Sequence, residues 1–324
     1  MYRLEALFIH RRQEKRRKVM LKYIAKRFGM AILTIFVVAT LTFFVMNFVP
    51  GGPFMSEKAV SPAAQAALEA KYGLDKPLFE QYLTYMSDAL HGDFGDSLKQ
   101  RGRTVSDIIV TKFPVSAKLG VTAVLLALCI GVPAGCIAAL NRGKTVDNII
   151  LVVATCGIAV PSFVVCTLLL YFFGVKLHIL PTYGLSSAAH YVMPVMALAF
   201  YPTAYITRLM RSSMLDVLGQ DYIRTAKAKG LSQFKQLFKH ALRNAILPIV
   251  TYIGPAFAYI ISGSFICEKI FTIPGLGGEF IGSITARDYP IIMGTTIFLA
   301  TVMVIMNTVV DIVYTLVDPR IKLK

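Results

Sequence analysis

The chain has 324 residues, of which 56% are hydrophobic and only 16% are charged, and its net charge is +16. Soluble domains usually carry charged residues at about a quarter of their positions, so this composition excludes an ordinary soluble globular protein. The mean hydropathy of +0.62 points instead to a chain that lies largely within a membrane. The positive charge requires no nucleic acid partner, because no soluble domain offers basic residues interleaved with aromatic ones.

Six uncharged stretches of this sequence are long enough to cross a bilayer as helices, which takes about 20 apolar residues each. We therefore expect an all-α fold, a polytopic membrane protein with six transmembrane helices. The first stretch is too long for the apolar part of a cleavable signal peptide and lacks a small-residue cleavage site. The stretches are residues 28–49, 119–140, 149–175, 191–207, 244–267 and 289–310.

Basic residues are distributed unevenly, and an excess of Lys and Arg marks the cytoplasmic side of a membrane protein. Residues 1–27 hold ten Lys or Arg against two acids, and residues 208–243 hold eight against two. Residues 50–113 hold seven against eight. We therefore expect both termini, the turn at 141–148 and the loop at 208–243 in the cytoplasm, with 50–113 on the opposite side.

The run that begins at Met20 would be a natural start of its own. Residues 1–19 are therefore expected to be a dispensable basic extension, or the result of an upstream start codon. The organisation that we expect is a basic cytoplasmic segment at 1–27, a first transmembrane helix at 28–49, an extracytoplasmic region at 50–113, a five-helix transmembrane core at 114–317 that includes the loop 208–243, and a cytoplasmic tail at 318–324.

The extracytoplasmic region contains two stretches that favour helices, at residues 61–72 and 78–90. Gly92 and Gly95 follow the second stretch and are expected to form turns, because glycine adopts positive φ at little cost. Two roles stay open for the region: contact with a partner protein, or cover for the mouth of a pathway.

The sequence offers no pattern typical of a catalytic, metal or nucleotide site. All five cysteines lie in predicted spans, so neither a disulfide framework nor a zinc site is expected. Gly143-Lys144-Thr145 resembles the end of a phosphate-binding loop, but that motif needs a glycine where Ala138 stands. We therefore expect neither enzymatic activity nor a bound cofactor.

Ion-coupled carriers usually keep ionisable side chains inside the membrane. Here the candidates are Lys118 and Asp311, which are expected to anchor or cap helices near the membrane surface. Prolines are frequent in the spans, and kinked helices suit a protein that lines a pathway and changes shape. These prolines are Pro133, Pro161, Pro194, Pro202, Pro248 and Pro255.

Residues 221–230 predict a short helix between two spans, with signals at both ends. Asp221 is a candidate N-cap, because its carboxylate can accept bonds from the first free backbone N–H groups. Lys227 and Lys229 lie in the last turn, where cations favour the helix dipole, and Gly230 suits a left-handed exit. Because so short a helix is marginal alone in water, we expect it to dock onto something else.

A second helix follows, with Ser232 as its expected cap. Two interpretations stay open: an amphipathic helix that lies on anionic lipid, or the outer half of a helix–turn–helix that packs on a cytosolic partner. Its apolar residues at helical spacing are Phe234, Leu237, Phe238, Ala241 and Leu242, accompanied by Lys235, Lys239 and Arg243.

This loop resembles the cytoplasmic loop of ABC importer permeases. Arg224-Thr-Ala-x-x-x-Gly230, nine further residues and then His240-Ala-Leu-Arg243 correspond to the E-A-A-x-x-x-G-x(9)-I-x-L-P pattern of that family. Arg224 and Thr225 replace the Glu and the first Ala of the pattern, and Arg243 replaces its Pro. A similar D-Y-I-R-T-A-x-A-K-G run is typical of the peptide/nickel subgroup.

Five other segments resemble the same subgroup, in the same order along the chain. From Met20 onward, the sequence is similar to the oligopeptide permease B branch of that subgroup. The segments are residues 91–97 (H-G-D-F-G-D-S), 113–120, 160–165, 268–277 and 318–321.

The resemblance implies a permease like those of type I ABC importers, in a bacterial inner membrane, which moves oligopeptides inward. It implies a heterodimer with a second homologous permease, two cytosolic ATPase subunits that hydrolyse the ATP, and an extracytoplasmic peptide-binding protein. Dipeptides or a nickel chelate are alternative cargoes. An ion-coupled carrier or channel is the alternative from a different class.

The resemblance also assigns roles within the loop 221–243. Gly230 would form the turn, Leu237 and Phe238 would act as scaffold, and the helix before them would contact the ATPase. No substrate-binding residue is predicted. The expected coupling residues are Asp221, Tyr222, Arg224, Thr225, Ala226, Lys227, Lys229 and Gly230.

Overall fold

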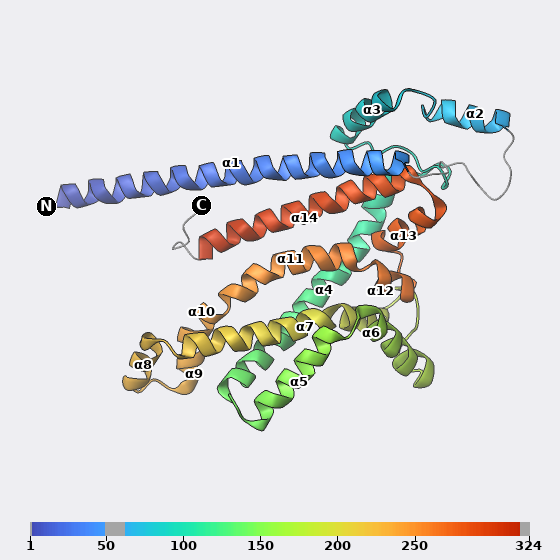
Figure 1. Ribbon diagram of the computed structural model, residues 1–324. Coiled ribbons are helices and arrows are strands. Elements are labelled where there is room, and N and C mark those ends of the chain that lie inside the picture. Colours follow the sequence, from blue (N-terminus) through green and yellow to red (C-terminus); the bar gives the residue numbers. More distant parts are fainter. Residues whose placement is uncertain (1, 49–61, 318–324) are drawn as a thin grey trace.

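The computed structural model describes residues 2–48 and 62–317, which form an array of helices (Figure 1). The all-α prediction is confirmed. A membrane chain needs such structure, because the hydrocarbon core offers no partner to a free backbone N–H or C=O group. The elements are α1 (Tyr2–Phe48), α2 (Pro62–Lys71), α3 (Leu78–Leu90), α4 (Val105–Leu140), α5 (Thr145–Ala159), α6 (Ser162–Leu169), the π-helix η1 (Leu170–Lys176), α7 (Ala189–Leu218), α8 (Asp221–Ala228), α9 (Gln233–Lys235), the π-helix η2 (Gln236–Ala241), α10 (Leu242–Ala245), α11 (Leu247–Gly263), α12 (Phe265–Ile270), α13 (Leu276–Ala286) and α14 (Tyr289–Val317).

Among the described residues, three helices are long and apolar enough to cross a membrane: Ala25–Phe48 within α1, all of α4, and Tyr289–Val310 within α14. The bent pair of α5 with α6–η1 makes a fourth if it counts as one span. α7 covers the predicted span 191–207, but its tyrosines and prolines lower its hydropathy. α11 covers most of 244–267, and its stretch Leu247–Phe257 is apolar but too short to cross a membrane by itself. Length and composition of the described helices therefore support three of the six predicted crossings, or four if the bent pair is one span.

The predicted span 149–175 is not one straight helix, because the chain bends by 102° between α5 and α6. Val160 is extended, with φ −80° and ψ 123°. The ring of Pro161 forces this conformation on the residue before it, and its missing N–H ends the hydrogen-bond ladder of α5. The sequence predicted only a kink at Pro161, but α5 ends before this residue and a new helix, α6, begins after it.

Glycines bring α4, α5 and α7 into close contact, and Figure 1 shows α4 crossing α7 in the middle of the fold. Gly131 and Gly135 of α4 both face α7, and a Cβ added at Gly135 would lie 2.6 Å from the backbone oxygen of Thr207. A Cβ added at Gly157 of α5 would lie 2.7 Å from that of Ala204. Small residues at such positions let membrane helices pack backbone to backbone.

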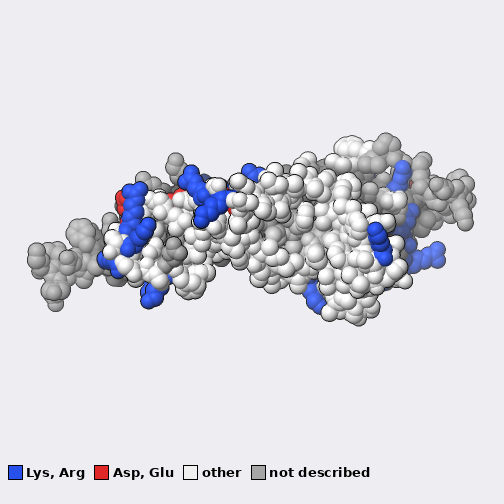
Figure 2. Space-filling view, turned by 90° about the horizontal axis from the view of Figure 1, so that it is seen from below, with Lys and Arg blue, Asp and Glu red and all other residues white. Residues whose placement is uncertain are grey.

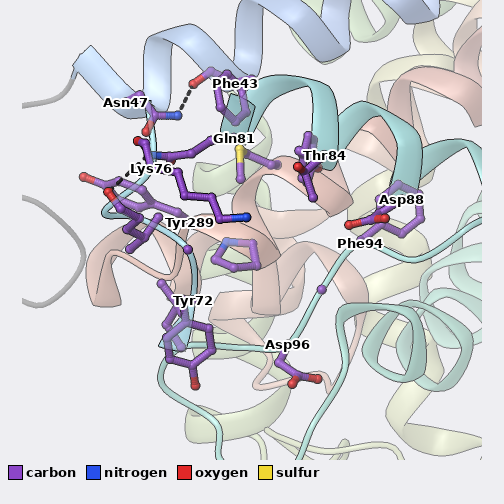
Figure 3. Close-up of a pocket in the computed structure, with 17 residues that line it drawn as sticks. Phe43, Asn47, Tyr72, Lys76, Gln81, Thr84, Asp88, Phe94, Asp96 and Tyr289 are labelled. Carbon is purple, nitrogen blue, oxygen red and sulfur yellow. Dashed lines mark hydrogen bonds between the residues drawn. The ribbon is translucent and has the colours of Figure 1, made fainter. Parts of the chain in front are cut away.

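α3 docks on the C-terminal end of α1. The hydroxyls of Thr40 and Tyr82 are hydrogen-bonded at 2.9 Å, and the Tyr82 ring stacks on Phe44 at 5.3 Å. A cavity of about 220 Å³ lies between α3, the end of α1 and the start of α14 (Figure 3). The hydroxyls of Tyr85 and Tyr289 are buried beside it and make no hydrogen bond to the described residues. Burial raises the pKa of Tyr85 above its ordinary value.

The helices predicted for the extracytoplasmic region are confirmed, since α2 and α3 occupy the stretches at 61–72 and 78–90 within the described residues. Gly92 and Gly95 form turns with φ of +78° and +82°, as predicted. Residues 318–321, one of the segments that resemble the peptide/nickel subgroup, lie outside the described residues.

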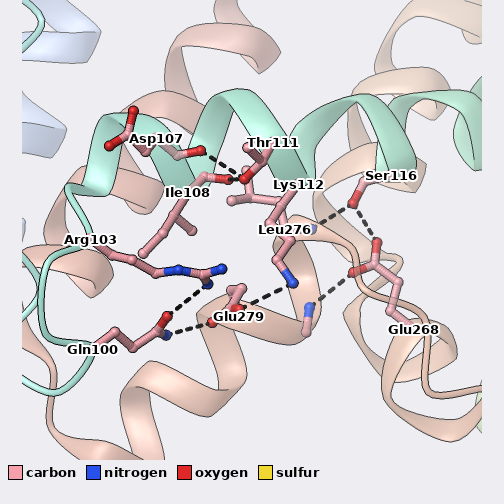
Figure 4. A network of polar contacts seen from close by, with 11 residues as sticks. Gln100, Arg103, Asp107, Ile108, Thr111, Lys112, Ser116, Glu268, Leu276 and Glu279 are labelled. Carbon is pink, nitrogen blue, oxygen red and sulfur yellow. Dashed lines mark hydrogen bonds and ion pairs between the residues drawn. The ribbon is translucent and has the colours of Figure 1, made fainter.

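A buried carboxylate in α12 joins this helix to α4 and α13. Glu268 is fully buried, and its Oε1 accepts hydrogen bonds from the hydroxyls of Ser116, at 2.7 Å, and Ser264, at 2.6 Å. Its Oε2 accepts the N–H of Gly278 at 2.9 Å. Figure 4 shows Ser116 and Glu268 pointing toward one another. A side chain at Gly275 would collide with this carboxylate, which explains the glycine at this position.

A second buried carboxylate, Asp288, lies between α13 and α14 and holds the loop after α3. It accepts the hydroxyl of Ser97 at 2.5 Å and the N–H groups of Leu98 and Lys99, both at 3.2 Å. Ser97 ends the segment 91–97 that resembles the peptide subgroup. The bonds to Asp288 therefore give the last residue of that segment a structural role.

The glycine contact between α4 and α7 predicts that Gly135→Ala destabilises the folded protein. Its Cβ would meet backbone rather than a movable side chain, so we expect a loss of about 1–3 kcal/mol and a lower thermal midpoint in detergent. Gly282→Ala is the matched control, since nothing lies within 4 Å of its added Cβ. A Gly135→Ala protein as stable as the Gly282→Ala protein would refute the contact.

Candidate coupling site

The candidate coupling site is the hairpin of α8, α9, η2 and α10, which connects α7 to α11 at one end of the molecule (Figure 1). The inner face of α8 is anchored by Ile223 and Ala226, each 5% exposed. Ile223 joins a core cluster with Met210 and Met214 of α7. A helix of eight residues is thereby held in place although it would be marginal alone.

The start of α8 differs from the prediction. Gln220 is the N-cap, in an extended conformation and without a side-chain cap bond, and Asp221 is the first helical residue. The Asp221 side chain is 96% exposed and lies 3.6 Å from the guanidinium of Arg224. Its negative charge still suits the helix N-terminus, but it does not cap the helix as predicted.

The end of α8 agrees with the prediction. Gly230 has φ +72°, its N–H donates to Lys227 O at 3.0 Å, and the N–H of Leu231 donates to Ala226 O at 3.3 Å. This pair of bonds is a Schellman motif. Nothing lies within 4 Å of a Cβ added at Gly230, so the backbone conformation, and not crowding, requires glycine there.

The second helix begins as predicted at Ser232, whose Oγ accepts the N–H of Lys235 at 3.4 Å. It continues as the π-helix η2 and not as regular α-helix. Ala241 is fully buried, and Leu237 packs partly buried on the same core cluster. Phe238 is 52% exposed, and its ring lies 4.4 Å from that of Phe234. Leu237 therefore fits the predicted scaffold role, whereas Phe238 does not.

The outer face of α8 presents most of the predicted coupling residues to solvent. Tyr222 is 41% exposed, and its hydroxyl accepts a hydrogen bond from Asn244 Nδ2 at 2.8 Å, which ties α8 to α10. Ala226 is the exception, because it lies on the inner face against the core. The exposed members are Asp221, Tyr222, Arg224, Thr225, Lys227, Lys229 and Gly230.

Charged side chains gather toward both ends of the face in Figure 2, and the middle of that face is nearly free of them. The hairpin lies at one of these ends. An uncharged band between charged ends is the pattern of a membrane-embedded protein. The Nζ of Lys118 lies 4.5 Å from the ring centre of Tyr191, and its anchoring at the membrane surface stays a prediction.

An ion pair that the sequence did not reveal fixes the turn between α4 and α5. Asp147 is 1% exposed and accepts two hydrogen bonds from Arg211 of α7, at 2.6 and 2.7 Å. The N–H of Gly143 donates to the same carboxylate at 2.9 Å. These bonds hold the pKa of Asp147 well below its ordinary value, Arg211 contributing most. The Gly143-Lys-Thr run is thus a structural turn.

Two family models match the chain and together cover most of it. One, described as "Binding-protein-dependent transport system inner membrane component", matches residues 131–323. The other, described as "Binding-prot-dependent transport system membrane comp, N-term", matches residues 20–120. The chain belongs to this family. The whole candidate coupling site lies within the first of these matches.

Curated members of this permease family are similar over nearly the full chain. The dipeptide transport system permease protein DppB of Bacillus subtilis (strain 168) is 49% identical over 94% of this chain and 99% of its own. The oligopeptide transport system permease proteins OppB of Haemophilus influenzae and Salmonella typhimurium are each 43% identical, over 94% of this chain and 100% of theirs. The resemblance to peptide permeases is confirmed.

Two solved structures of the MetNI methionine ABC transporter, both inward-facing, share the fold. Their TM-scores are 0.52 and 0.53 at 17% and 16% identity, covering 65% of this chain and 96% of the matched chain. Identity this low speaks for the fold alone, which is that of the membrane subunit of an ABC importer.

The ion pair of the permease predicts that Asp147→Asn lowers the thermal midpoint by several degrees, because Arg211 then keeps its charge without a matching carboxylate. The pKa of Asp147 is lowered in the folded state. The stabilisation is therefore complete above the ordinary carboxyl pKa of about 4 and is lost as the pH falls toward the folded-state value. Asp221→Asn is the control on an exposed acid. Equal midpoints for the two variants at neutral pH would contradict the role of this pair.

Proposed function

We propose that this chain is the permease subunit of an ATP-driven importer that carries oligopeptides into the cytoplasm. The observation that supports this most is the identity of 43% to 49% with permeases named for oligopeptide and dipeptide transport, over nearly complete lengths. Because both kinds of relative are similar to this chain, dipeptides are the alternative cargo. The chain itself is the membrane component and leaves catalysis to other subunits.

The proposed orientation in the bacterial inner membrane has both termini and the hairpin in the cytoplasm. The excess of Lys and Arg in residues 1–27 and 208–243 supports it, since positive residues are retained inside. α2 and α3 then lie on the outside, where an extracytoplasmic peptide-binding protein would deliver the cargo.

The proposed complex contains a second, homologous permease and two cytosolic ATPase subunits. Each permease contributes one half of the pathway, and its hairpin sits on one ATPase. α8 suits this contact because Ile223 and Ala226 hold its inner face on the core while Tyr222, Arg224 and Lys227 remain exposed. A rigidly held helix with an exposed polar face can transmit displacement in either direction.

The proposal predicts that the conformation of Gly230 matters for coupling. Gly230→Val places a β-branched residue at φ +72°, which costs about 1–2 kcal/mol, so we expect weaker recovery of ATPase subunits with the purified permease and slower peptide uptake. Gly230→Asn is the matched control at the same position, because asparagine tolerates the left-handed region. Full activity of the valine variant would overturn the role of this turn.

Variants at Tyr222 test whether α8 docks on the ATPase, because this side chain is exposed and is not part of the core. Tyr222→Ala removes an exposed ring from the outer face of α8, and we expect loss of ATPase recovery and of peptide-stimulated ATP hydrolysis. Tyr222→Phe keeps the ring and loses only the hydrogen bond from Asn244. If Tyr222→Ala retains the ATPase as well as Tyr222→Phe does, the docking assignment is wrong. If the wild-type complex takes up no peptide from any binding protein supplied, the proposed function itself fails.

A further inference from the structure

A cavity of about 520 Å³ opens where α5 breaks from α6, between α7 and α11. The backbone from Ile158 to Ser162 forms one wall, and Tyr201, Tyr252 and Tyr259 contribute aromatic side chains to the others. No residue of the candidate coupling site lines it.

The cavity lies near the middle of the predicted membrane. The break at Pro161 is close to the centre of the stretch 149–175, and Pro255 is close to the centre of 244–267. Tyr201 lies near the centre of 191–207. Broken membrane helices at this depth occur where they line a cavity or are buried in protein.

The break leaves main-chain polar groups without helical partners. Pro161 has no N–H to donate to the carbonyl of Gly157. α6 starts afresh at Ser162, so its first N–H groups have no acceptor in a preceding turn. A ligand that carries both N–H and C=O groups can satisfy both sets.

Tyrosines add an aromatic and polar surface to the same cavity. Tyr205, which does not line the cavity, stacks on two tyrosines that do, with its ring centre 4.3 Å from that of Tyr252 and 6.3 Å from that of Tyr201. Tyr201 is 42% exposed. A second cavity of about 320 Å³, between α4, α5 and α7, has no tyrosine among its lining residues, which are mainly aliphatic, as at Ile130 and Val153. That second lining suits a lipid chain, whereas the tyrosines suit a polar ligand.

The helices around the tyrosine-lined cavity belong to two glycine-locked units. α5 is held to α7 at Gly157, as described above. α11 is held to α14 at Gly254, where an added Cβ would collide with Val310. The coupling hairpin joins the two units, because α8 follows α7 and α10 leads into α11. Displacement of the hairpin would therefore change the width of the cavity.

We propose that this cavity binds the main chain of a peptide in transit, which deepens and rests on the proposed function. The free backbone groups around Pro161 and the hydroxyls of Tyr201 and Tyr252 hydrogen-bond the amides of the peptide. The tyrosine rings contact its side chains without selecting among them. Recognition of this kind is independent of peptide sequence.

The test uses the complete transporter with its partner subunits and binding protein, in vesicles of phosphatidylethanolamine and phosphatidylglycerol. Tyr201→Phe and Tyr252→Phe each remove one hydroxyl and keep the ring, so we expect uptake of trialanine to fall about fivefold per variant, the effect of one hydrogen bond. Tyr171→Phe is the matched control, on an exposed tyrosine of η1 that does not line the cavity.

A second experiment locates the bound peptide directly and does not rely on the rate of uptake. A tripeptide with a central benzoylphenylalanine is photo-cross-linked during transport, and adducts are expected on α7 and α11 at the cavity. Wild-type uptake in both phenylalanine variants, or adducts only elsewhere, would overturn the assignment and leave the importer intact. Labelling of the cavity by a benzophenone-bearing phospholipid but not by the peptide would identify lipid as the occupant and also overturn it. Absence of uptake in the wild type would remove the proposed function and this inference together.

Discussion

Three buried carboxylates accept hydrogen bonds at breaks between helices, and the arrangement of the helices depends on these bonds. Asp147, Glu268 and Asp288 are each at most 1% exposed. Each accepts at least one backbone N–H from a turn or a helix start, and each accepts a side-chain donor as well. In a membrane protein a free N–H is costly, so a carboxylate at such a point stabilises the turn and ties it to a distant helix.

These hydrogen bonds hold two different parts of the molecule. Glu268 and Asp288 fasten the segments around α12 and α13 to α4 and to the loop after α3. Asp147 fastens the turn before α5 to Arg211, seven residues before the end of α7. The hairpin that follows α7 is held by apolar contacts, so it is attached firmly but exposes a polar face.

Local rules predicted the central turn of the hairpin well and the long-range contacts poorly. Gly230 and Ser232 were predictable because a left-handed exit and a side-chain cap depend on a few neighbouring residues. The prediction for Asp221 was wrong, because the helix begins one residue earlier than expected. An extended Gln220 occupies the N-cap position, and Asp221 is the first helical residue. Ser97 and Asp288 are separated by 191 residues, and no periodicity along the chain reports such a pair. The proline at position 161 was visible in the sequence. A straight helix and a bent one have the same apolar composition, however, so the size of the bend could not be predicted.

Close glycine contacts join the helices on both sides of the tyrosine-lined cavity. α4 approaches α7 so closely at Gly135, and α5 approaches it so closely at Gly157, that even a methyl group has no room. α11 and α14 are joined in the same manner at Gly254. The tyrosine-lined cavity lies where α11 meets α7 and the break between α5 and α6. The hairpin joins α7 to α11, so it connects two of the helices that line this cavity.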